Sequence, residues 1–295
     1  MTPEGRVPSV RPPAVTRLAL LGALVVCACP GPSVMDGGTG GSGGGDEEFL
    51  FDVSGTAAMY PEGIGLLADA GRSTSVAGLT VRVEEPLRVA TNDPLGYFST
   101  TVLDSTGAFS ATMISDQLVS LGVAAGVIDD AGVRAVRSAT VLWDVAFEQK
   151  KPDKNITGAK AWVFPVELEA ALTAAVTEAQ ILSITGANQK RTLSQAGCIL
   201  GRVINASGAP VSGATVVPTK ASLASHFFYP TADLTGTGAA TSTNGLFIFI
   251  HDGSSSVEQF SFDVMGATGY RRRSAGARDG ACLIATVYPG DTAPP

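Results

Sequence analysis

The residues that could do chemistry are few in this sequence. The chain has two histidines, His226 and His251, so a site built from three imidazoles is excluded, and no H-E-x-x-H motif is present. His226 precedes an aromatic run and His251 opens the turn His251-Asp252-Gly253, so we expect both to be solvated loop residues. The sequence therefore predicts no metal site and no cofactor.

Serine patterns are equally weak. The stretch Gly40–Gly44 matches the nucleophile elbow G-x-S-x-G, but it lies among glycines, whereas the elbow needs a strand before it and a helix after it. The stretch Gly63–Ala68 imitates a dinucleotide-binding fingerprint, and we expect it to be a loop between β segments. A catalytic triad needs no closeness in sequence, so a hydrolase stays as a remote alternative to the main prediction, a protein that is not an enzyme.

Two surfaces are candidates for binding. Arg271 and Arg273 would share one face of a strand, where they could hold a carboxylate-rich partner or an anionic glycan through bidentate contacts. The aromatic run Phe227, Phe228 and Tyr229 is the second candidate, because such residues are favoured at interfaces. The alternatives are a solvated strand for the arginines and a place in the core for the aromatic residues.

Composition and charge narrow the fold and the partners. The chain has 35 Gly and 17 Pro with 16% charged residues, which favours short strands and tight turns over long helices. Its formal net charge is −7, and becomes −9 without residues 1–28. An acidic protein is a poor partner for nucleic acid, so we expect none.

The N-terminus predicts export. The apolar segment Leu18–Val26 is too short to span a bilayer and is typical of a signal peptide, here residues 1–28. Val26-Cys27-Ala28-Cys29 resembles the lipobox of bacterial lipoproteins, through Val26 and Ala28, which implies lipidation of Cys29. The alternative is an ordinary cleaved signal that contains two cysteines.

The resemblance to a lipobox also implies a cellular location. Pro30 after the modified cysteine favours sorting to the outer membrane of a Gram-negative cell, so we expect a lipid-anchored protein of the cell envelope. Residues 29–48 are Gly-rich and lack apolar periodicity, which predicts a flexible tether. Its root-mean-square reach would be roughly 25 Å.

Two related domains follow the tether. Val211–Val216 parallels Val76–Val81, and Asn244–Phe247 parallels Thr106–Phe109. Such an internal repeat predicts two copies of one module. We expect a diverged first domain at residues 49–164 and a second domain at residues 198–290, followed by a tail at 291–295.

The second copy has a recognisable pattern. Gly201-Arg202-Val203, the run Ala206–Val216, Thr243–Phe247 and Gly266–Tyr270 resemble the carboxypeptidase regulatory-like, or transthyretin-like, domain. The resemblance implies a Greek-key sandwich that serves as an accessory or spacing module in secreted bacterial proteins. It does not imply peptidase activity.

Residues 165–197 form the predicted helical connector. Pro165 suits the first position of a helix, and Gly186 is a plausible stop. Thr177 with Gln180 could form a capping box, which would divide one helix into two. The periodicity leaves both possibilities open.

Cys198 and Cys282 are the cysteines that remain besides Cys27 and Cys29. One begins the first strand of the second domain and the other lies in its last strand, and these ends often meet in a Greek-key sandwich. We therefore predict a Cys198–Cys282 disulfide, which would contribute about 2–4 kcal/mol. Two buried free thiols are the alternative.

The sequence as a whole predicts a mainly β protein of two Greek-key (transthyretin/Ig-like) β-sandwich domains joined by a short helical segment. Its predicted function is that of a lipid-anchored envelope protein whose non-catalytic modules bind or adhere to an envelope protein or glycan. A structural spacer or assembly subunit of an envelope complex is the alternative.

Overall fold

A computed structural model describes residues 47–88 and 97–290 of the chain. The predicted signal peptide, Cys29 and its lipidation, nearly all of the predicted tether and the tail 291–295 lie outside these residues. Residues 46–295 form one compact unit. In the part of the chain that the structure describes, no helix is both long and apolar enough to cross a bilayer.

The first half of the described chain is mainly β. Alternating apolar residues such as Phe51 and Val53 produce strands with one buried face. Its strands are β1 (Leu50–Met59), β2 (Thr80–Glu84), β3 (Tyr97–Val102), β4 (Ala108–Ser115), β5 (Gly122–Ile128), β6 (Ala135–Val136), β7 (Ser138–Asp144) and β8 (Ile156–Pro165). Its helices are α1 (Pro61–Asp69) and α2 (Val145–Glu148), with the 3-10 helices η1 (Pro86–Arg88) and η2 (Asp116–Leu118).

Helices α3 (Val166–Val176), α4 (Glu178–Thr185) and α5 (Leu193–Ala196) lead into the second half, with η3 (Gly186–Asn188) between α4 and α5. The second half is again mainly β. Its strands are β9 (Cys198–Val203), β10 (Thr215–Pro218), β11 (Phe227–Pro230), β12 (Thr237–Gly238), β13 (Leu246–Ile250), β14 (Val257–Met265), β15 (Arg273–Arg278) and β16 (Cys282–Val287), and η4 (Ala221–His226) precedes β11.

The two halves repeat one topology. In the first half, β1 pairs antiparallel with β4 and parallel with β8; in the second, β9 pairs antiparallel with β13 and parallel with β16. The antiparallel ladder β2-β5-β7 of the first half matches β10-β14-β15 of the second. Corresponding ladders therefore occur in both halves, and each half is a β-sandwich.

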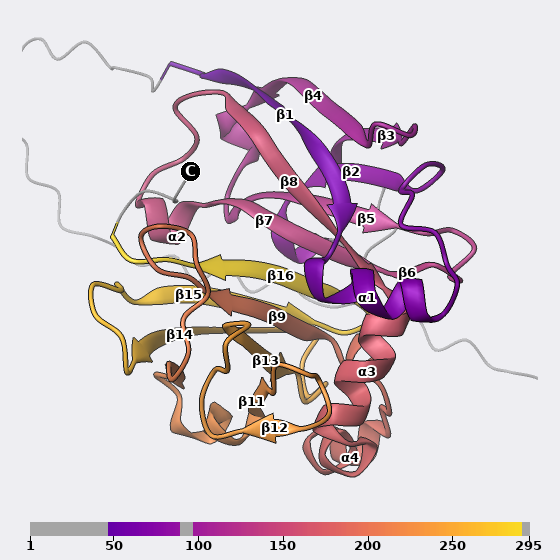
Figure 1. The fold of residues 1–295 in the computed structure, drawn as a ribbon. Helices are drawn as coiled ribbons and strands as arrows, with labels where there is room; N and C mark the ends of the chain where they lie inside the picture. Colours follow the sequence, from indigo (N-terminus) through magenta and orange to yellow (C-terminus); the bar gives the residue numbers. More distant parts are fainter. Residues whose placement is uncertain (1–46, 89–96, 291–295) are drawn as a thin grey trace, which may run out of the picture. The chain divides into compact units, whose positions relative to one another are not determined.

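The two sandwiches are joined through their main chains. Strand β16 pairs parallel with β7, with Cys282 opposite Ser138 and Ile284 opposite Thr140. One sheet of each sandwich therefore becomes part of a single 9-stranded sheet, in the order β12-β11-β13-β9-β16-β7-β5-β2-β3. Figure 1 shows β16, in yellow, alongside β7. The sequence predicts a link through the helical connector, and the structure adds this shared sheet.

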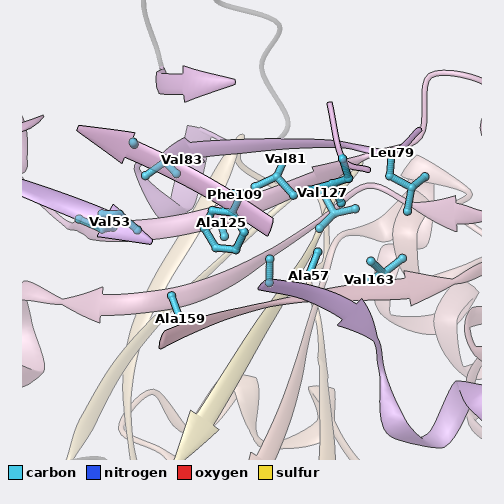
Figure 2. Close-up of a cluster of buried hydrophobic side chains, with 14 of the residues drawn as sticks. Val53, Ala57, Leu79, Val81, Val83, Phe109, Ala125, Val127, Ala159 and Val163 are labelled. Carbon is cyan, nitrogen blue, oxygen red and sulfur yellow. The ribbon is translucent and has the colours of Figure 1, made fainter. Parts of the chain in front are cut away.

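A smaller sheet completes each sandwich. The 4-stranded sheet β4-β1-β8-β6 completes the first, and its core consists mainly of valine and alanine side chains from β1, β2, β4, β5 and β8, together with Phe109 (Figure 2). The 3-stranded sheet β10-β14-β15 completes the second. The second core is aromatic, with Phe227, Phe247, Phe249 and Phe260 among its buried residues.

The connector helices cover strands β9, β11 and β13 of the shared sheet, on the face opposite the aromatic core. Leu168, Leu172 and Ile181 pack with Leu200 and Ile248 in a third buried cluster. Thr177 divides α3 from α4, because its hydroxyl accepts the Gln180 N–H at 3.3 Å and so caps the second helix. The structure therefore selects two helices from the two possibilities, and Pro165 is the N-cap of α3 rather than its first helical residue.

Helix α1 corrects one sequence interpretation. The glycine-containing stretch Gly63–Ala68, which we expected to be a loop, lies within α1. Pro61 and Glu62 lie in the first turn of α1. A proline is tolerated there because an N–H at that position would have no partner within the helix, and an acidic side chain is stabilised by the positive end of the helix dipole. Buried Leu67 attaches the helix to the first core.

The predicted disulfide is confirmed. Cys198 and Cys282 are direct partners at the start of the parallel β9–β16 ladder, with Cα atoms 4.6 Å apart. Cys282 also pairs with Ser138 of β7, so the bond joins β9 to β16 at the point where β16 meets the first sandwich.

Candidate functional site

The two predicted arginines, Arg271 and Arg273, do not form one exposed patch with their neighbour Arg272. The Arg273 side chain is buried over the rings of Phe147 and Tyr288, and the Arg271 guanidinium lies 4.8 Å from the centre of the Phe147 ring. Since Phe147 belongs to α2 of the first sandwich, both arginines contribute to contact between the sandwiches.

The remaining arginine of the cluster, Arg272, has a partner in its own sandwich. Its guanidinium donates to both carboxylate oxygens of Asp263, at 3.0 and 2.8 Å. This bidentate pair uses the donors that an anionic ligand would need. The structure therefore places Arg273 in an internal contact and leaves Arg271 exposed beside Phe147, so that the two arginines do not share one exposed face.

The predicted aromatic surface is also internal. Phe227, Phe228 and Tyr229 form β11 and are all buried. Phe227 and Tyr229 lie in the aromatic core, whereas Phe228 faces the connector helices. The Tyr229 hydroxyl donates to the Val216 carbonyl at 3.2 Å. The alternative weighed for these residues, a place in the core, is the one that the structure shows.

The histidines differ from expectation as well. His251 is fully buried, with its Nδ1 3.1 Å from the Asp279 carboxylate and 3.0 Å from the Gly253 N–H. It is not the solvated loop residue that its turn sequence indicates. His226 is partly buried and stacks on Phe249. Within residues 47–88 and 97–290, no group of three or more metal-ligating side chains is gathered.

A groove between the two sandwiches is the best-formed candidate site. It has a volume of about 480 Å³. One side consists of Ser274, Ala275 and Gly276 in β15, and the other includes Pro86 of η1 and Leu121 before β5. The buried apolar residues Phe260 and Leu283, together with Val141 of β7, line it as well. We call this site the β15 groove.

The edge of β15 provides backbone hydrogen-bonding groups along the groove. Strand β15 ends the 3-stranded sheet, so among the described strands only β14 pairs with it. An edge strand presents a row of unpaired N–H and C=O groups that can pair with another chain. The matching strand of the first sandwich, β7, pairs with β16 at its outer edge. The two sandwiches therefore differ at equivalent edges, one joined and one open.

Small side chains make this edge accessible. Ser274, Ala275 and Gly276 occupy the middle of β15, where larger residues would fill the groove. The signal in the sequence is the run of three small residues, Ser274-Ala275-Gly276, between the arginines at the two ends of β15. Those arginines are charged residues of the kind that protects an edge, so the sequence alone favoured a charged surface and did not predict an accessible edge.

Few charged groups line the groove. Burial raises the pKa of the Asp144 carboxyl, while the N–H groups of Ala146 and Phe147, at 3.0 and 3.3 Å, act in the opposite direction as they cap α2. The Lys220 ammonium donates to Glu258 at 2.5 Å. Both groups already have partners, so the groove offers backbone and apolar contacts rather than a charged pocket.

Comparisons with known proteins place the chain far from any relative. No family model matches the chain, and no curated protein sequence matches it. The solved structures found include the Bacillus anthracis TIE protein, with 7% identity, a TM-score of 0.22 and coverage of 81% of this chain and 34% of that one. This chain thus spans about a third of the length of that protein.

Two pilins are found at similar distances. The shaft pilin SpaA from Lactobacillus rhamnosus GG is 7% identical with a TM-score of 0.22, over 83% of this chain and 100% of that one. The Streptococcal ancillary pilin is 10% identical with a TM-score of 0.22, over 82% and 69%. At such scores the similarity says nothing about function, and the mainly β fold is established by the ladders of the chain itself.

Proposed function

We propose that the protein is a lipid-anchored, non-catalytic protein of the cell envelope, whose second sandwich binds an extended segment of a partner protein as an added strand next to β15. The observation that carries this proposal is the open edge of β15 beside a groove, at the position where the first sandwich has its edge joined to β16.

The internal junction is a template for the added strand. Because β16 runs parallel to β7, a segment bound in the equivalent way runs parallel to β15. Alternate side chains of a strand point to opposite faces, so every second side chain of the segment would face Val141 and Leu283. The groove thus favours a segment with apolar residues at alternate positions, and backbone pairing supplies the affinity.

The finer parts of this identity rest on sequence. The lipobox around Cys29 is the basis for the anchor and for the outer membrane as the location. The glycine pattern from Gly201 to Tyr270 is the basis for a carboxypeptidase regulatory-like second sandwich. Both remain proposals, together with the envelope protein or glycan that the sequence predicts as a partner.

A spacer is a second candidate because the two sandwiches are coupled by more than the connector. The Arg202 guanidinium of β9 pairs with Glu62 of α1, and Arg72 pairs with Glu167 at 2.8 Å. With the shared sheet, these contacts favour a stiff body that holds a partner at a fixed distance from the membrane. Failure of the groove to bind any strand would leave this function in place.

The strand-addition proposal can be tested with a defined peptide. A soluble peptide with the β16 sequence Leu283–Val287 and lysine tails should bind at β15 in the way that β16 binds β7. Hydrogen–deuterium exchange of the full chain should then show slower exchange of the amides of residues 273–278. A copy of the peptide with alternate N-methylated amides keeps the side chains, and should give no protection.

Edge variants locate the site. Ser274→Lys places a charge on the β15 edge and should weaken the protection at least several-fold, because an edge lysine opposes strand pairing. Val217→Lys, on the opposite edge of the same sheet, is the matched control and should leave it unchanged. Protection that appears at β10, or that survives N-methylation, would reject strand addition at β15.

The anchor needs its own test. Cys29→Ala should move the protein from the membrane fraction to the soluble fraction, since no lipid could then be attached. Continued membrane association of this variant would contradict the lipoprotein part of the proposal without bearing on the β15 groove.

A further inference from the structure

Four large apolar side chains are exposed together at one end of the first sandwich. Phe49, Leu50, Met113 and Leu118 have exposed fractions of 37%, 41%, 67% and 65%. Single exposed apolar residues are ordinary, whereas a cluster of them often marks an interaction surface. We call these four residues the apolar end.

Backbone contacts hold the four residues close to one another. The Phe49 N–H donates to the Asp116 carboxylate at 3.0 Å, and the Asp116 N–H donates to the Phe49 carbonyl at 2.9 Å. Leu50 is the ladder partner of Ser115, and Leu118 ends η2 two residues after Asp116. Met113 and Leu118 line the same depression of about 300 Å³.

The backbone is bent to expose Met113. The ladder between β1 and β4 shifts register between Phe51 and Val53, and Met113 in the bulged strand has φ = 57°. A residue with a side chain is disfavoured in this left-handed region. The bulge is held by the Met113 N–H, which donates to the Asp52 carboxylate at 2.9 Å. The strained position thus turns a large apolar side chain outward.

The predicted lipid anchor would hold this end near the membrane. Phe49 follows the predicted lipidated residue, Cys29, by 20 residues. A Gly-rich sequence of that length would have a root-mean-square reach of roughly 25 Å. A lipid on Cys29 would therefore keep the apolar end within this reach of the bilayer, which gives contact there a high effective concentration.

The charges around the apolar end select the kind of lipid. Glu47 and Glu48 are exposed next to Phe49, and the carboxylates of Asp52 and Asp116 lie within the same group of backbone contacts. Acidic side chains are repelled by anionic headgroups. A bilayer surface rich in zwitterionic lipid is therefore the occupant that fits both the apolar residues and their acidic surroundings.

We infer that the apolar end rests on the bilayer and inserts Met113 and Leu118 among the headgroups, so that the first sandwich is oriented as well as tethered. This inference rests on the lipid anchor of the proposed function. It gives the exposed apolar residues and the strained Met113 a common role.

A labelled full-length lipoprotein tests the inference. Leu118→Cys, with an environment-sensitive fluorophore, is reconstituted in phosphatidylcholine–phosphatidylethanolamine vesicles. Met265→Cys, which replaces an exposed apolar residue of β14, is the matched control. The label at 118 should show blue-shifted emission and at least several-fold stronger quenching by nitroxide lipids than the label at 265. Replacing part of the lipid by phosphatidylglycerol should reduce the difference.

The outcomes separate this inference from the anchor. If the Leu118→Cys protein sediments with vesicles but its label is quenched no more than that of the control, the apolar end does not touch the bilayer, although the anchor stands. If neither labelled protein sediments with vesicles, the anchor and the inference both fail. A blue shift that grows with protein concentration and ignores the lipid quencher would indicate a protein partner, and would overturn the inference.

A polar variant provides a second measurement. Met113→Ser with Leu118→Ser in the Met265→Cys background should leave sedimentation with vesicles unchanged. The double substitution should make the tumbling of a label at position 265 faster, because the body is then tethered without being oriented. An unchanged melting temperature shows that the variant folds. Unchanged tumbling in a folded variant would contradict the orienting role.

Discussion

The two sandwiches have the same ladder order but are filled with different side chains. In the first, the β1–β4 pair brings Gly55 opposite Phe109, and in the second the β9–β13 pair brings Gly201 opposite Phe247. Two residues later the first sandwich has Ala111 and the second has Phe249. One topology therefore accepts both a mainly aliphatic core and a core rich in phenylalanine.

The two sandwiches also differ in whether a corresponding edge strand is paired. Strand β7 has its outer edge paired with β16, and the equivalent β15 is left open. The intervening strand differs too, because β3 pairs with β2 whereas β11 pairs with β13. The repeat is therefore conserved in its central ladders and varied at its edges, where partners can be gained or lost.

The largest expected effect tests the aromatic core. The Phe249 ring lies 4.4 Å from Phe260 and 5.1 Å from Phe227, measured between ring centres. Phe249→Ala removes both contacts and leaves a cavity, so we expect a loss of about 3–5 kcal/mol in the free energy of unfolding. Denaturant titration measures this loss.

A substitution in the first core is the comparison for that value. Val81 is buried among aliphatic side chains, and Val81→Ala deletes two methyl groups at a cost of about 2 kcal/mol. An equal loss for Phe249→Ala and Val81→Ala would mean that the two cores contribute alike, and would break the contrast between them.

The next effect concerns the matched glycines. A Cβ atom at Gly55 would stand 2.1 Å from the Ala159 carbonyl oxygen, whereas one at Gly201 would meet the Phe247 ring, with its nearest atom at 1.9 Å. A ring can shift and a paired backbone cannot. We expect both alanine variants to lose about 1–3 kcal/mol, with Gly55→Ala the more destabilised, as thermal melting would show.

The reverse order would be informative. A greater loss for Gly201→Ala would show that the aromatic core is too tightly packed for Phe247 to move. The second core would then be the stiffer of the two.

The last effect is a pH dependence that Glu84 gives to the first sandwich. Burial raises the pKa of Glu84 in β2 to about 7, against the pull of Arg82 and Arg137; at the matching position of the repeat, the second sandwich has the uncharged Thr219. The folded state therefore holds a proton that the unfolded state releases above pH 4.5. The stability of the protein should fall as the pH rises from 4.5 to about 7.

Glu84→Gln removes this proton and its pH dependence. The variant should be more stable than the natural protein by at most about 3 kcal/mol above pH 7, with the difference disappearing below pH 4.5. Thr219→Val in the second sandwich is the control, and its effect should not vary with pH. A constant difference between Glu84→Gln and the natural chain across this range would contradict a buried, protonated Glu84.

Local pattern predicted much of the fold. The apolar runs Cys198–Val203 and Leu246–Ile250 predicted strands that the structure contains, and the cysteines at the ends of the second domain predicted their bond. These features depend on neighbours in sequence or on one familiar topology. The sequence did not predict helix α1, because its glycines disfavour a helix more strongly than Pro61 and Glu62 favour one. In the structure, the packing of Leu67 overrides this weak helix propensity.

The sequence did not predict which strands pair when they lie far apart in the chain. Strands β7 and β16 are about 140 residues apart, and their ladder is made by main-chain groups that every residue shares. The sequence predicted a strand at each of these places, but not which strand lies beside which. The candidate site was missed for the same reason, because the β15 groove exists only once the two sandwiches share a sheet. Burial of His251 and of Phe227–Tyr229 likewise depends on elements far away in sequence.

The disulfide has a mechanical consequence. Cys198 and Cys282 are 84 residues apart, and the loop between them includes β10 to β15. A load applied across the chain bypasses this loop, so about 290 Å of contour length stays locked while the bond is intact. A protein pulled between its anchor and a bound partner would stretch little in its second sandwich. Reduction of the disulfide would remove this limit, so that the second sandwich could unfold and lengthen under load.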